Sequence, residues 1–357
     1  MTLSEPGVES RKASMRPLTR FAWLALAYNI AVILWGAYVR ATGSGAGCGN
    51  RWPLCNGTVL PRAPQVQTII EFTHRLTSGL AILMVSSLLV WCWRKTSKGD
   101  WARRSSLLAI VLLFNEALLG ALLVLFEHVS QDRSLARAFF LCAHFGNTLL
   151  LLTALVLTAH WLSDGRGRFS LVKNRAEIAA VVLGLLATTC LGMTGSLAAL
   201  GDTLFPATSL RASLIEDFSS GNILLRLRFL HPVAAAIAAI YVLWLILRSL
   251  KRPRRLWNQE LMLAGVLIGQ IGLGILNVLL LAPVWLQLVH LLVAELFWVV
   301  VVLASANLLF ATVDCEAVAT TGRDSMATPR ASNEFAFHAA CDGGNPYHPY
   351  RKRHERC

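Results

Sequence analysis

The sequence has few charged residues for its length. Charged side chains make up 15% of the 357 residues, whereas soluble globular domains carry about 25%. The mean hydropathy is +0.55, and several apolar runs are long enough to cross a bilayer. This combination excludes a cytosolic globular enzyme and an intrinsically disordered chain.

Acidic residues and cysteine are also scarce. The chain has 20 Asp and Glu against 33 Lys and Arg. No basic stretch is interleaved with aromatic residues as a nucleic-acid surface requires, so we expect no nucleic-acid partner. The 8 cysteines are too few for a disulfide scaffold. No small-residue cleavage site follows the first apolar run, so no cleavable signal peptide is expected.

Eight nearly uncharged spans dominate what is present. Each is long enough to cross about 30 Å of hydrocarbon. Because lipid cannot satisfy a free backbone polar group, the spans must be helical. The expected fold class is an all-α membrane protein with eight transmembrane helices, over Phe21–Val39, Leu76–Trp93, Ser105–Phe126, Ala138–Leu162, Ile178–Leu200, Phe229–Leu247, Leu261–Leu281 and Val284–Phe310.

Lys and Arg gather in alternate connections between these spans. The leader and the loops after the second, fourth and sixth spans are strongly basic, and the opposite loops are not. The positive-inside rule therefore predicts that both termini are cytoplasmic. The chain divides into a leader at 1–17, a four-helix half at 18–162, a cytoplasmic linker at 163–177, a second four-helix half at 178–311 and a polar tail at 312–357, which we expect to be disordered.

The two halves resemble each other weakly. Thr42-Gly43-Ser44-Gly45 matches Thr194-Gly195-Ser196, and Leu118-Leu119-Gly120 matches Gly272-Leu273-Gly274. Because each half has four spans, both halves cross the membrane in the same direction. This predicts two pseudo-symmetric four-helix bundles related by an axis along the membrane normal. The alternative is coincidental similarity among Leu-rich helices.

Four of the 9 histidines lie at similar depths, near the outer ends of the even-numbered spans: His74, His144, His231 and His290. An ionisable side chain within a span is costly and is a candidate for function. Two histidines on facing helices can ligate a heme iron from opposite sides. We therefore predict two heme sites, one between His74 and His144 and one between His231 and His290.

These four histidines have two other interpretations. The rings can simply form interhelical hydrogen bonds. Zinc is disfavoured because no third or fourth ligand from Cys, His or a carboxylate lies at matching depth in each half. The remaining histidines are expected to be solvated; they are His128, His160, His338, His348 and His354.

An acidic side chain accompanies only one of the two pairs. Glu71 lies three residues before His74, on the same helix face. The equivalent position before His231 is Arg228. A carboxylate beside a heme can exchange protons, so Glu71 is the candidate catalytic residue, and the second site suits electron transfer. Alternatively, Glu71 is a supporting partner of the histidine or an interfacial charge.

Other polar residues in the spans have two interpretations. Glu116 and Glu295 are candidates for function, but Glu116 corresponds to Gln270 and can be an interhelical contact. Four arginines near the outer ends either pair with heme propionates or anchor the helix ends; they are Arg40, Arg75, Arg226 and Arg228.

Cys48 and Cys55 lie close together in the first outer loop, where Gly49 and Pro53 favour a turn. An oxidising compartment would allow a disulfide between them. It would close only a small ring, so its contribution to stability is modest. The pair is either a redox couple beside the first heme site or a structural clasp.

Five motifs, in order and with all four histidines, resemble the heme A synthase family of bacteria and mitochondria. The resemblance covers residues 18 to 311 and is carried by Gly36–Gly45, the Cys48–Cys55 loop, Glu71–Arg75, Ala199–Pro206 and Pro283–His290. Two departures are Gly49, where the family often has Pro, and Glu116, where Gln is commoner.

The resemblance implies a reaction. Members of this family oxidise a methyl group of heme O to a formyl group, giving heme A for terminal oxidases, with water as the expected oxygen source. It implies heme O between His74 and His144 with Glu71 as the catalytic residue, and heme B between His231 and His290. It also implies a disulfide between Cys48 and Cys55.

The resemblance also implies a location and partners. The protein is expected in the bacterial cell (inner) membrane, in contact with membrane lipid. Its expected partners are a heme O synthase upstream, a terminal oxidase downstream and an electron acceptor that the sequence does not identify. A second copy of the chain is a further candidate partner.

Two rival functions come from other classes. A non-catalytic diheme b-type electron-transfer protein would hold two hemes of ordinary type. A heme or small-solute transporter would use the repeat for alternating access. Few Gly or Pro residues interrupt the spans at mid-membrane, which disfavours the transporter.

Overall fold

The computed structural model describes residues 6–62, 64–164, 169–171, 174–212, 215, 222–250 and 257–312. Within these residues, 8 helices are long and apolar enough to cross a membrane. The prediction of an all-α, multi-pass membrane protein is therefore confirmed. The tail from residue 313, the first five residues of the leader and His338, His348 and His354 lie outside the described residues.

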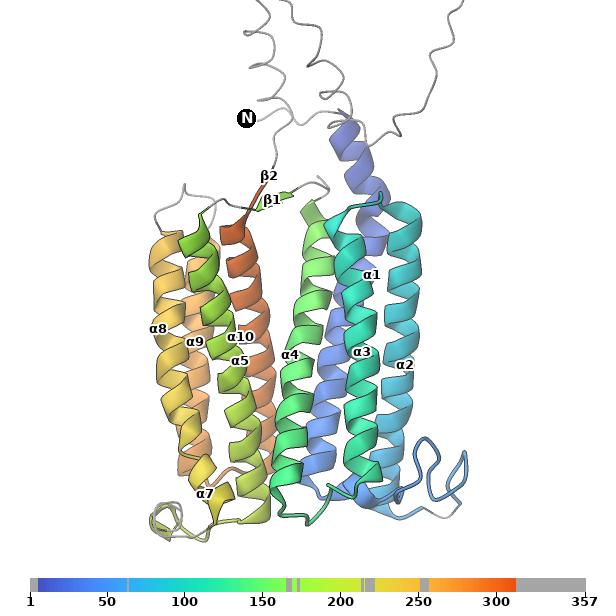
Figure 1. Ribbon diagram of the computed structural model, residues 1–357, viewed down its shortest axis with the longest axis vertical. Helices are drawn as coiled ribbons and strands as arrows, with labels where there is room; N and C mark the ends of the chain where they lie inside the picture. Colours follow the sequence, from blue (N-terminus) through green and yellow to red (C-terminus); the bar gives the residue numbers. More distant parts are fainter. Residues whose placement is uncertain are drawn as a thin grey trace, which may run out of the picture.

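The first half of the chain forms four long helices that lie together on the right of Figure 1. The second half forms another four on the left. The first group is α1 (Pro6–Ala41), α2 (Val66–Lys95), α3 (Trp101–Leu125) and α4 (Leu135–Asp164), with the 3-10 helix η1 (Ser44–Ala46) after α1. The second is α5 (Arg175–Leu204), α8 (Leu230–Ser249), α9 (Trp257–Leu279) and α10 (Val284–Leu309), with the short α7 (Ile223–Leu227) before α8.

Short polar residues begin several of these helices. The Asp100 carboxylate accepts a hydrogen bond from the Ala102 N–H at the start of α3. Asn174 and Asn222 cap α5 and α7 in the same way. Arg94 and Lys95 occupy the last turn of α2, where cations offset the helix dipole. The helix ends therefore follow from the polar residues that flank each apolar span.

The two halves meet where α4 packs against α5 and α10 and where α1 packs against α10. Helices α4 and α10 are the most buried of the eight spans, with half of their most apolar windows inside the protein. The Trp298 Nε1–H on α10 donates to the Leu149 carbonyl (2.8 Å) and to Thr153 Oγ1 (3.1 Å) on α4. Leu152 on α4 and Val302 on α10 belong to one hydrophobic cluster. The interface is therefore an apolar core with a few specific hydrogen bonds.

The structure differs from the expected boundaries in four places. Helix α2 begins at Val66 and not near the expected Leu76, so Glu71 and His74 lie within the helix. Helix α1 already begins at Pro6, so the described part of the leader is helical. The linker contains β1 (Phe169–Leu171), which pairs antiparallel with β2 (Phe310–Thr312) directly after α10. The sixth span begins earlier than expected, as α7, and is interrupted at Arg228 before α8 continues. The sequence did not predict the strand pair or the earlier start of the sixth span. Strand pairing in the linker and a helix cap at Asn222 produce no hydrophobic periodicity.

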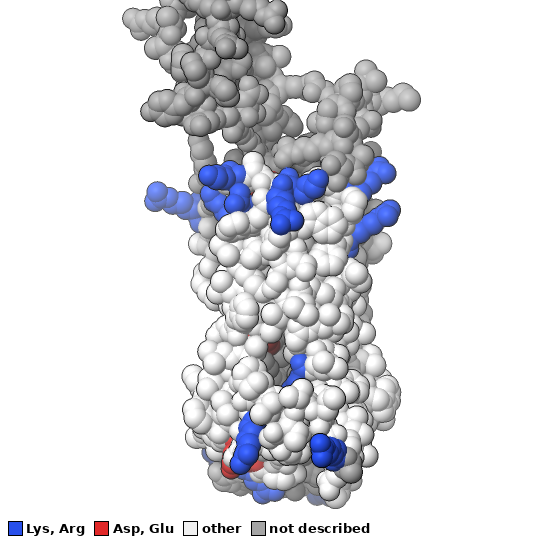
Figure 2. All heavy atoms as spheres, turned by 90° about the vertical axis from the view of Figure 1, so that its right-hand side faces the viewer, with Lys and Arg blue, Asp and Glu red and all other residues white. Residues whose placement is uncertain are grey.

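The face drawn in Figure 2 is largely uncharged in its middle. Many of the Lys and Arg on this face lie at the upper end, and others lie with Asp or Glu at the lower end. Many large apolar side chains point outward, and Ile268 on α9 is 71% exposed. Such a surface suits hydrocarbon. The upper and lower ends of the bundle are named as they are oriented in Figure 1.

Candidate functional site

The second pair of predicted histidines comes together. His231 on α8 and His290 on α10 face each other, with ring centroids 6.5 Å apart and ring planes at 85°. The Nδ1 atom of His231 lies 3.4 Å from Thr194 Oγ1 on α5. The Nε2 atom of His290 lies 3.3 Å from Gln270 Nε2 on α9. All four helices of the second half thus reach this pair.

The first pair is arranged on the corresponding helices of the first half. His74 lies on α2 and His144 on α4. The Nδ1 atom of His144 lies 3.4 Å from Glu116 Oε1 on α3. The odd-numbered span α3 thus supplies a polar neighbour of the His144 ring.

A glycine on a neighbouring helix lies against each ring. A Cβ atom added at Gly36 would lie 2.9 Å from His74 Cε1, and one at Gly195 would lie 3.0 Å from His231 Cε1. The same contact is 3.3 Å for Gly274 and His290 and 3.7 Å for Gly120 and His144. The same type of contact therefore occurs four times, in the same order in the two halves. In the comparison of the two halves, Gly195 therefore corresponds to Gly36 and not to the expected Thr42–Gly45 segment.

The spacing of the second pair allows a metal between its two rings, and the ligand count among the described residues favours a heme over a bare metal ion. A metal held about 2 Å from two imidazole nitrogens requires ring centroids roughly 6 Å apart, close to the spacing of His231 and His290. The Nδ1 atoms of His74, His144 and His290 are buried and have no hydrogen-bond partner among the described residues. Within the same part of the chain, no group of three or more His, Cys, Asp or Glu side chains could hold a metal. An iron at either pair would need its other ligands from a macrocycle.

Glu71 is buried at the lower end of α2, with 3% of its surface exposed. Its Oε2 atom accepts a hydrogen bond of 2.7 Å from the Cys48 backbone N–H. Its Oε1 atom forms an ion pair with Arg75, one turn further along α2. Arg75 also donates to the Leu54 carbonyl at 2.9 Å. The carboxylate is therefore held in one position by its own helix and by the loop of residues 43–58.

Close backbone contacts fasten this loop to α2. A Cβ atom at Gly47 would lie 2.5 Å from the Gln67 carbonyl, so only glycine allows the approach. The Gly47 carbonyl accepts from Thr68 Oγ1 at 2.8 Å. Cys48 and Cys55 are joined as a disulfide within the loop. Gly47 and the Cys48–Cys55 disulfide together hold the Cys48 N–H within hydrogen-bonding distance of Glu71.

The corresponding position in the second half is occupied differently. Arg228 lies between α7 and α8 and donates through Nη2 to the Gly201 and Phe205 carbonyls at the end of α5, at 2.6 and 2.9 Å. Its Nε atom lies 3.6 Å from Asp202. Arg228 therefore ties α8 to α5, and this turn carries a cation where the first half carries Glu71.

The other predicted arginines also contact protein groups. Arg40 on α1 donates to Thr203 Oγ1 on α5 (3.1 Å) and to Gln287 Oε1 on α10 (3.3 Å). It therefore links the two halves at the lower end, a role that sequence reasoning missed.

The two other buried acids differ in their surroundings. Glu116 accepts hydrogen bonds from Asn147 Nδ2 and Thr148 Oγ1 on α4. Glu295 on α10 is 1% exposed, and neither of its oxygens has a hydrogen-bond partner among the described residues. Glu116 is thus part of a polar network around His144, whereas Glu295 lies on the α10 face that meets the first half.

Two of the histidines expected to be solvated are partly buried. His128 Nδ1 lies 2.8 Å from Asp132 Oδ2, and the ring packs against Phe140. His160 packs against Trp161 at the upper end of α4. The expectation of solvated rings was therefore wrong for both, because the adjacent loop and aromatic side chains cover them.

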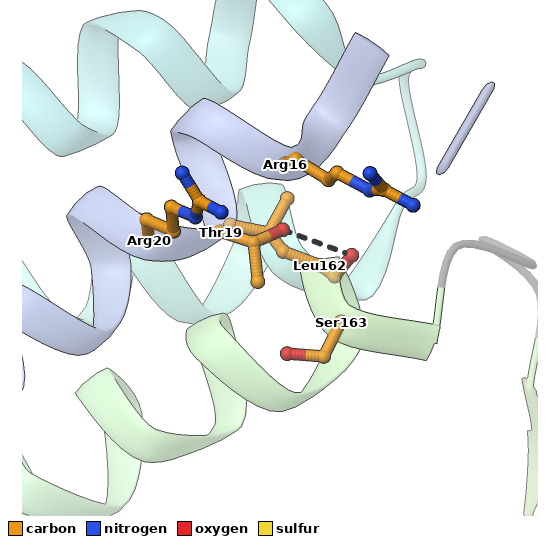
Figure 3. Close-up of a pocket in the computed structure, with 5 residues that line it drawn as sticks. All are labelled: Arg16, Thr19, Arg20, Leu162 and Ser163. Atoms are coloured by element: carbon orange, nitrogen blue, oxygen red, sulfur yellow. Dashed lines mark hydrogen bonds between the residues drawn. The ribbon is translucent and has the colours of Figure 1, made fainter. Parts of the chain in front are cut away.

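Two cavities lie near the ends of the bundle. One of about 390 Å³ lies between α1 and α4 at the upper end, far along α4 from His144. It is lined by Arg16, Thr19, Arg20, Leu162 and Ser163 (Figure 3). The other, of about 340 Å³, lies at the lower end beside the disulfide loop and is lined by Ala46, Gly49, Asn50, Val124, Glu127, Val129 and Ser130. Of these two, the second lies nearer to Glu71.

Known proteins match most of the chain. Residues 19–302 match the family model COX15-CtaA, described as cytochrome oxidase assembly protein. A protein of Thermus thermophilus named protoheme IX farnesyltransferase is 46% identical over 298 residues, which are 82% of this chain and 48% of that protein. A heme A synthase of Alkalihalophilus pseudofirmus is 41% identical over 136 residues, 38% of this chain and 43% of that protein.

A heme A synthase of Halalkalibacterium halodurans is 38% identical over 152 residues, 42% of this chain and 48% of that protein. The chain spans about half the length of the curated relatives it matches. The extent of the family match, together with the eight spans and the ordered motifs, confirms the resemblance. The chain belongs to the COX15-CtaA family of cytochrome oxidase assembly proteins.

Proposed function

We propose that this protein is a heme A synthase, an oxidoreductase that converts a methyl group of heme O to a formyl group. The observation that carries the proposal is the buried carboxylate of Glu71 one helical turn before His74, whereas the matched turn before His231 carries Arg228. The relatives named heme A synthase support the same activity. Oxidising a methyl group to a formyl group with water releases four protons and four electrons, so the site needs a proton acceptor and an outlet for electrons.

In this proposal, His74 and His144 hold the substrate heme O, and Glu71 accepts protons at its carboxylate. The Cys48 N–H and Arg75 keep both oxygens of Glu71 in place. A fixed general base contributes typically 10²–10⁴-fold to a rate.

His231 and His290 hold heme B, which supplies one-electron transfer when bound. The surroundings of this pair suit that role, because the turn before His231 carries Arg228, already engaged with Gly201, Phe205 and Asp202. An external electron acceptor completes the reaction. The two four-helix halves thus correspond to a substrate site and a relay site.

The orientation follows from the distribution of basic residues. We propose that the upper end, where Lys and Arg gather in Figure 2, faces the cytoplasm of a bacterial cell. The histidine pairs and the disulfide loop then lie near the outer face, where an oxidising compartment maintains a disulfide.

The relative named protoheme IX farnesyltransferase indicates a partner. The match covers 48% of that protein, so the activity in its name can reside in the unmatched part. Farnesylation of protoheme IX yields the farnesylated heme that the proposed reaction consumes. We therefore propose that a prenyl-transferring enzyme delivers heme O to this chain, and that heme A passes on to a terminal oxidase.

Heme composition tests the proposed reaction. Glu71→Gln should retain bound heme but abolish heme A in pigment extracted from cells that lack another heme A synthase. Glu127→Gln is a matched control, because Glu127 is a carboxylate at the same end that contacts Asn50 in an exposed position. Normal heme A with Glu71→Gln would remove Glu71 from the mechanism. Protoheme as the sole pigment with the unaltered chain would favour the diheme electron-transfer alternative.

A further inference from the structure

A polar network surrounds His144 and is not repeated around His290. Glu116 lies four residues before Gly120, the glycine that touches His144, and Gln270 lies four residues before Gly274, the glycine that touches His290. Both side chains reach the histidine of their own half, but at different ring nitrogens: Glu116 Oε1 lies 3.4 Å from His144 Nδ1, whereas Gln270 Nε2 lies 3.3 Å from His290 Nε2. The two positions correspond in the repeat, and only the first carries a carboxylate, which lies beside Nδ1.

Neighbouring positions strengthen the contrast. In the first half, Asn115 Nδ2 donates to Asn147 Oδ1 at 2.8 Å, and Asn147 donates to Glu116 Oε2. Thr148 donates to Glu116 Oε1. Aligning His144 with His290 and Gly120 with Gly274 places apolar residues or glycine at the corresponding positions of the second half, which are Gly269, Val293 and Ala294.

We infer that Glu116 is a positioning residue that lowers the reduction potential of the first heme relative to the second. This inference rests on the proposed heme sites. When Nε2 of a histidine binds iron, its Nδ1–H needs an acceptor, and a carboxylate there orients the ring and makes it a stronger ligand. The Nδ1 atom of His144 has no hydrogen-bond partner among the described residues, and Glu116 Oε1 is an acceptor 3.4 Å away from it.

The expected consequence is a direction for electron flow. A negative charge beside the ligand favours ferric over ferrous iron, because the ferric centre carries one more positive charge. Gln270 is a neutral amide that lies beside Nε2 of His290, so it supplies no carboxylate to Nδ1 of that ring. A charge-assisted hydrogen bond is roughly twice as strong as a neutral one. Electrons released at the first site therefore move to the second site down a potential difference that the protein sets.

Reciprocal exchange of these two residues tests the inference. Glu116→Gln should shift the ferric–ferrous equilibrium of the first heme about tenfold toward ferrous, which for one electron is about 59 mV. Gln270→Glu should lower the potential of the second heme. The measurement is a potentiometric titration of the purified, heme-loaded protein followed optically, with the iron–histidine environment monitored by electron paramagnetic resonance.

A third variant separates charge from packing. Asn147→Val removes a hydrogen bond to Glu116 and introduces the residue found at the matched position of the second half, but it keeps the carboxylate. The inference expects a clearly smaller shift than with Glu116→Gln. An equal shift with Asn147→Val, or none with Glu116→Gln while both hemes are bound, would overturn it.

The remaining outcomes are also decisive. If Glu116→Gln does not fold, Gln270→Glu carries the test, and an unchanged second potential overturns the inference. If the unaltered protein binds no heme at either pair, the proposed function itself fails, which is distinct from two bound hemes with unmoved potentials.

Discussion

In the first half, the helical turn before His74 carries Glu71, and in the second half the matched turn before His231 carries Arg228. The glycine contacts to the histidines are of the same kind in both halves. The environments differ: Glu71 is fixed by Arg75 and Cys48, whereas Arg228 donates to backbone carbonyls of α5. The comparison indicates that the two halves place their histidines in the same way. A few charged side chains around each histidine pair then make the two environments different.

The largest expected effect comes from removing one pair of ligands at a time. His74→Ala with His144→Ala should eliminate heme from the first half and all heme A formation, while the second-half heme remains. His231→Ala with His290→Ala should eliminate the second heme. Optical spectra and extracted pigment of the purified variants measure both. Loss of both hemes from either double variant, in folded protein, would show that the halves are not independent sites.

A smaller effect is expected from Arg75→Gln. This change leaves Glu71 with the Cys48 N–H but removes the cation that holds Oε1. Misplacing a catalytic group costs up to about 10²-fold, so heme A formation should fall by roughly that factor or less while both hemes stay bound. Arg228→Gln should instead weaken heme B retention, because it loosens α8 from α5. The opposite assignment of these two phenotypes would contradict the proposed division of roles.

Alanine substitutions at the four glycines should have graded effects. The space available for a Cβ atom is smallest at Gly36 and Gly195 (2.9 and 3.0 Å), larger at Gly274 (3.3 Å) and ordinary at Gly120 (3.7 Å). Heme occupancy should therefore fall most for the first two, each in its own half, and be nearly unchanged for Gly120→Ala. Occupancy per half is measured by quantitative heme extraction. A ranking unrelated to these distances would show that the glycines do not set the ring positions.

The smallest expected effect concerns the loops at the lower end. Burial raises the pKa of Asp132, but hydrogen bonds from Ser134 and His128 outweigh it, so the pKa lies below its ordinary value. The corresponding loop of the second half turns at Leu281 and Ala282, whose φ angles are positive (59° and 53°). A carboxyl group with a lowered pKa stabilises the fold above its ordinary pKa, and this contribution is lost as the pH falls through the folded-state value.

Asp132→Asn should consequently lower the free energy of unfolding at pH 7 by about 1 kcal/mol or less. The difference from the unaltered protein should shrink as the pH falls below about 4. Thermal unfolding in detergent at several pH values checks this. A difference in stability that grows toward acid pH would contradict the conclusion that the ionised carboxylate of Asp132 is the stabilising form.

The sequence was sufficient to predict the eight spans, because each apolar run must be helical to satisfy its backbone in lipid. It was also sufficient to single out Glu71 and the four histidines as unusual polar residues in or beside spans, although the second helix begins at Val66 and not near the expected Leu76. It did not reveal that Gly36 is the contact of His74, because a glycine among apolar residues gives no sign of which ring it faces. The role of Gly47 likewise depends on a backbone approach between segments that are separated in sequence.

The most direct test of the account is the type and number of hemes in the purified protein. The account predicts two hemes per chain, one protoheme and one farnesylated heme of the O or A type, separated by extraction and chromatography. Protoheme alone, or a single heme per chain at full occupancy, would contradict the assignment of one half to substrate and the other to electron transfer.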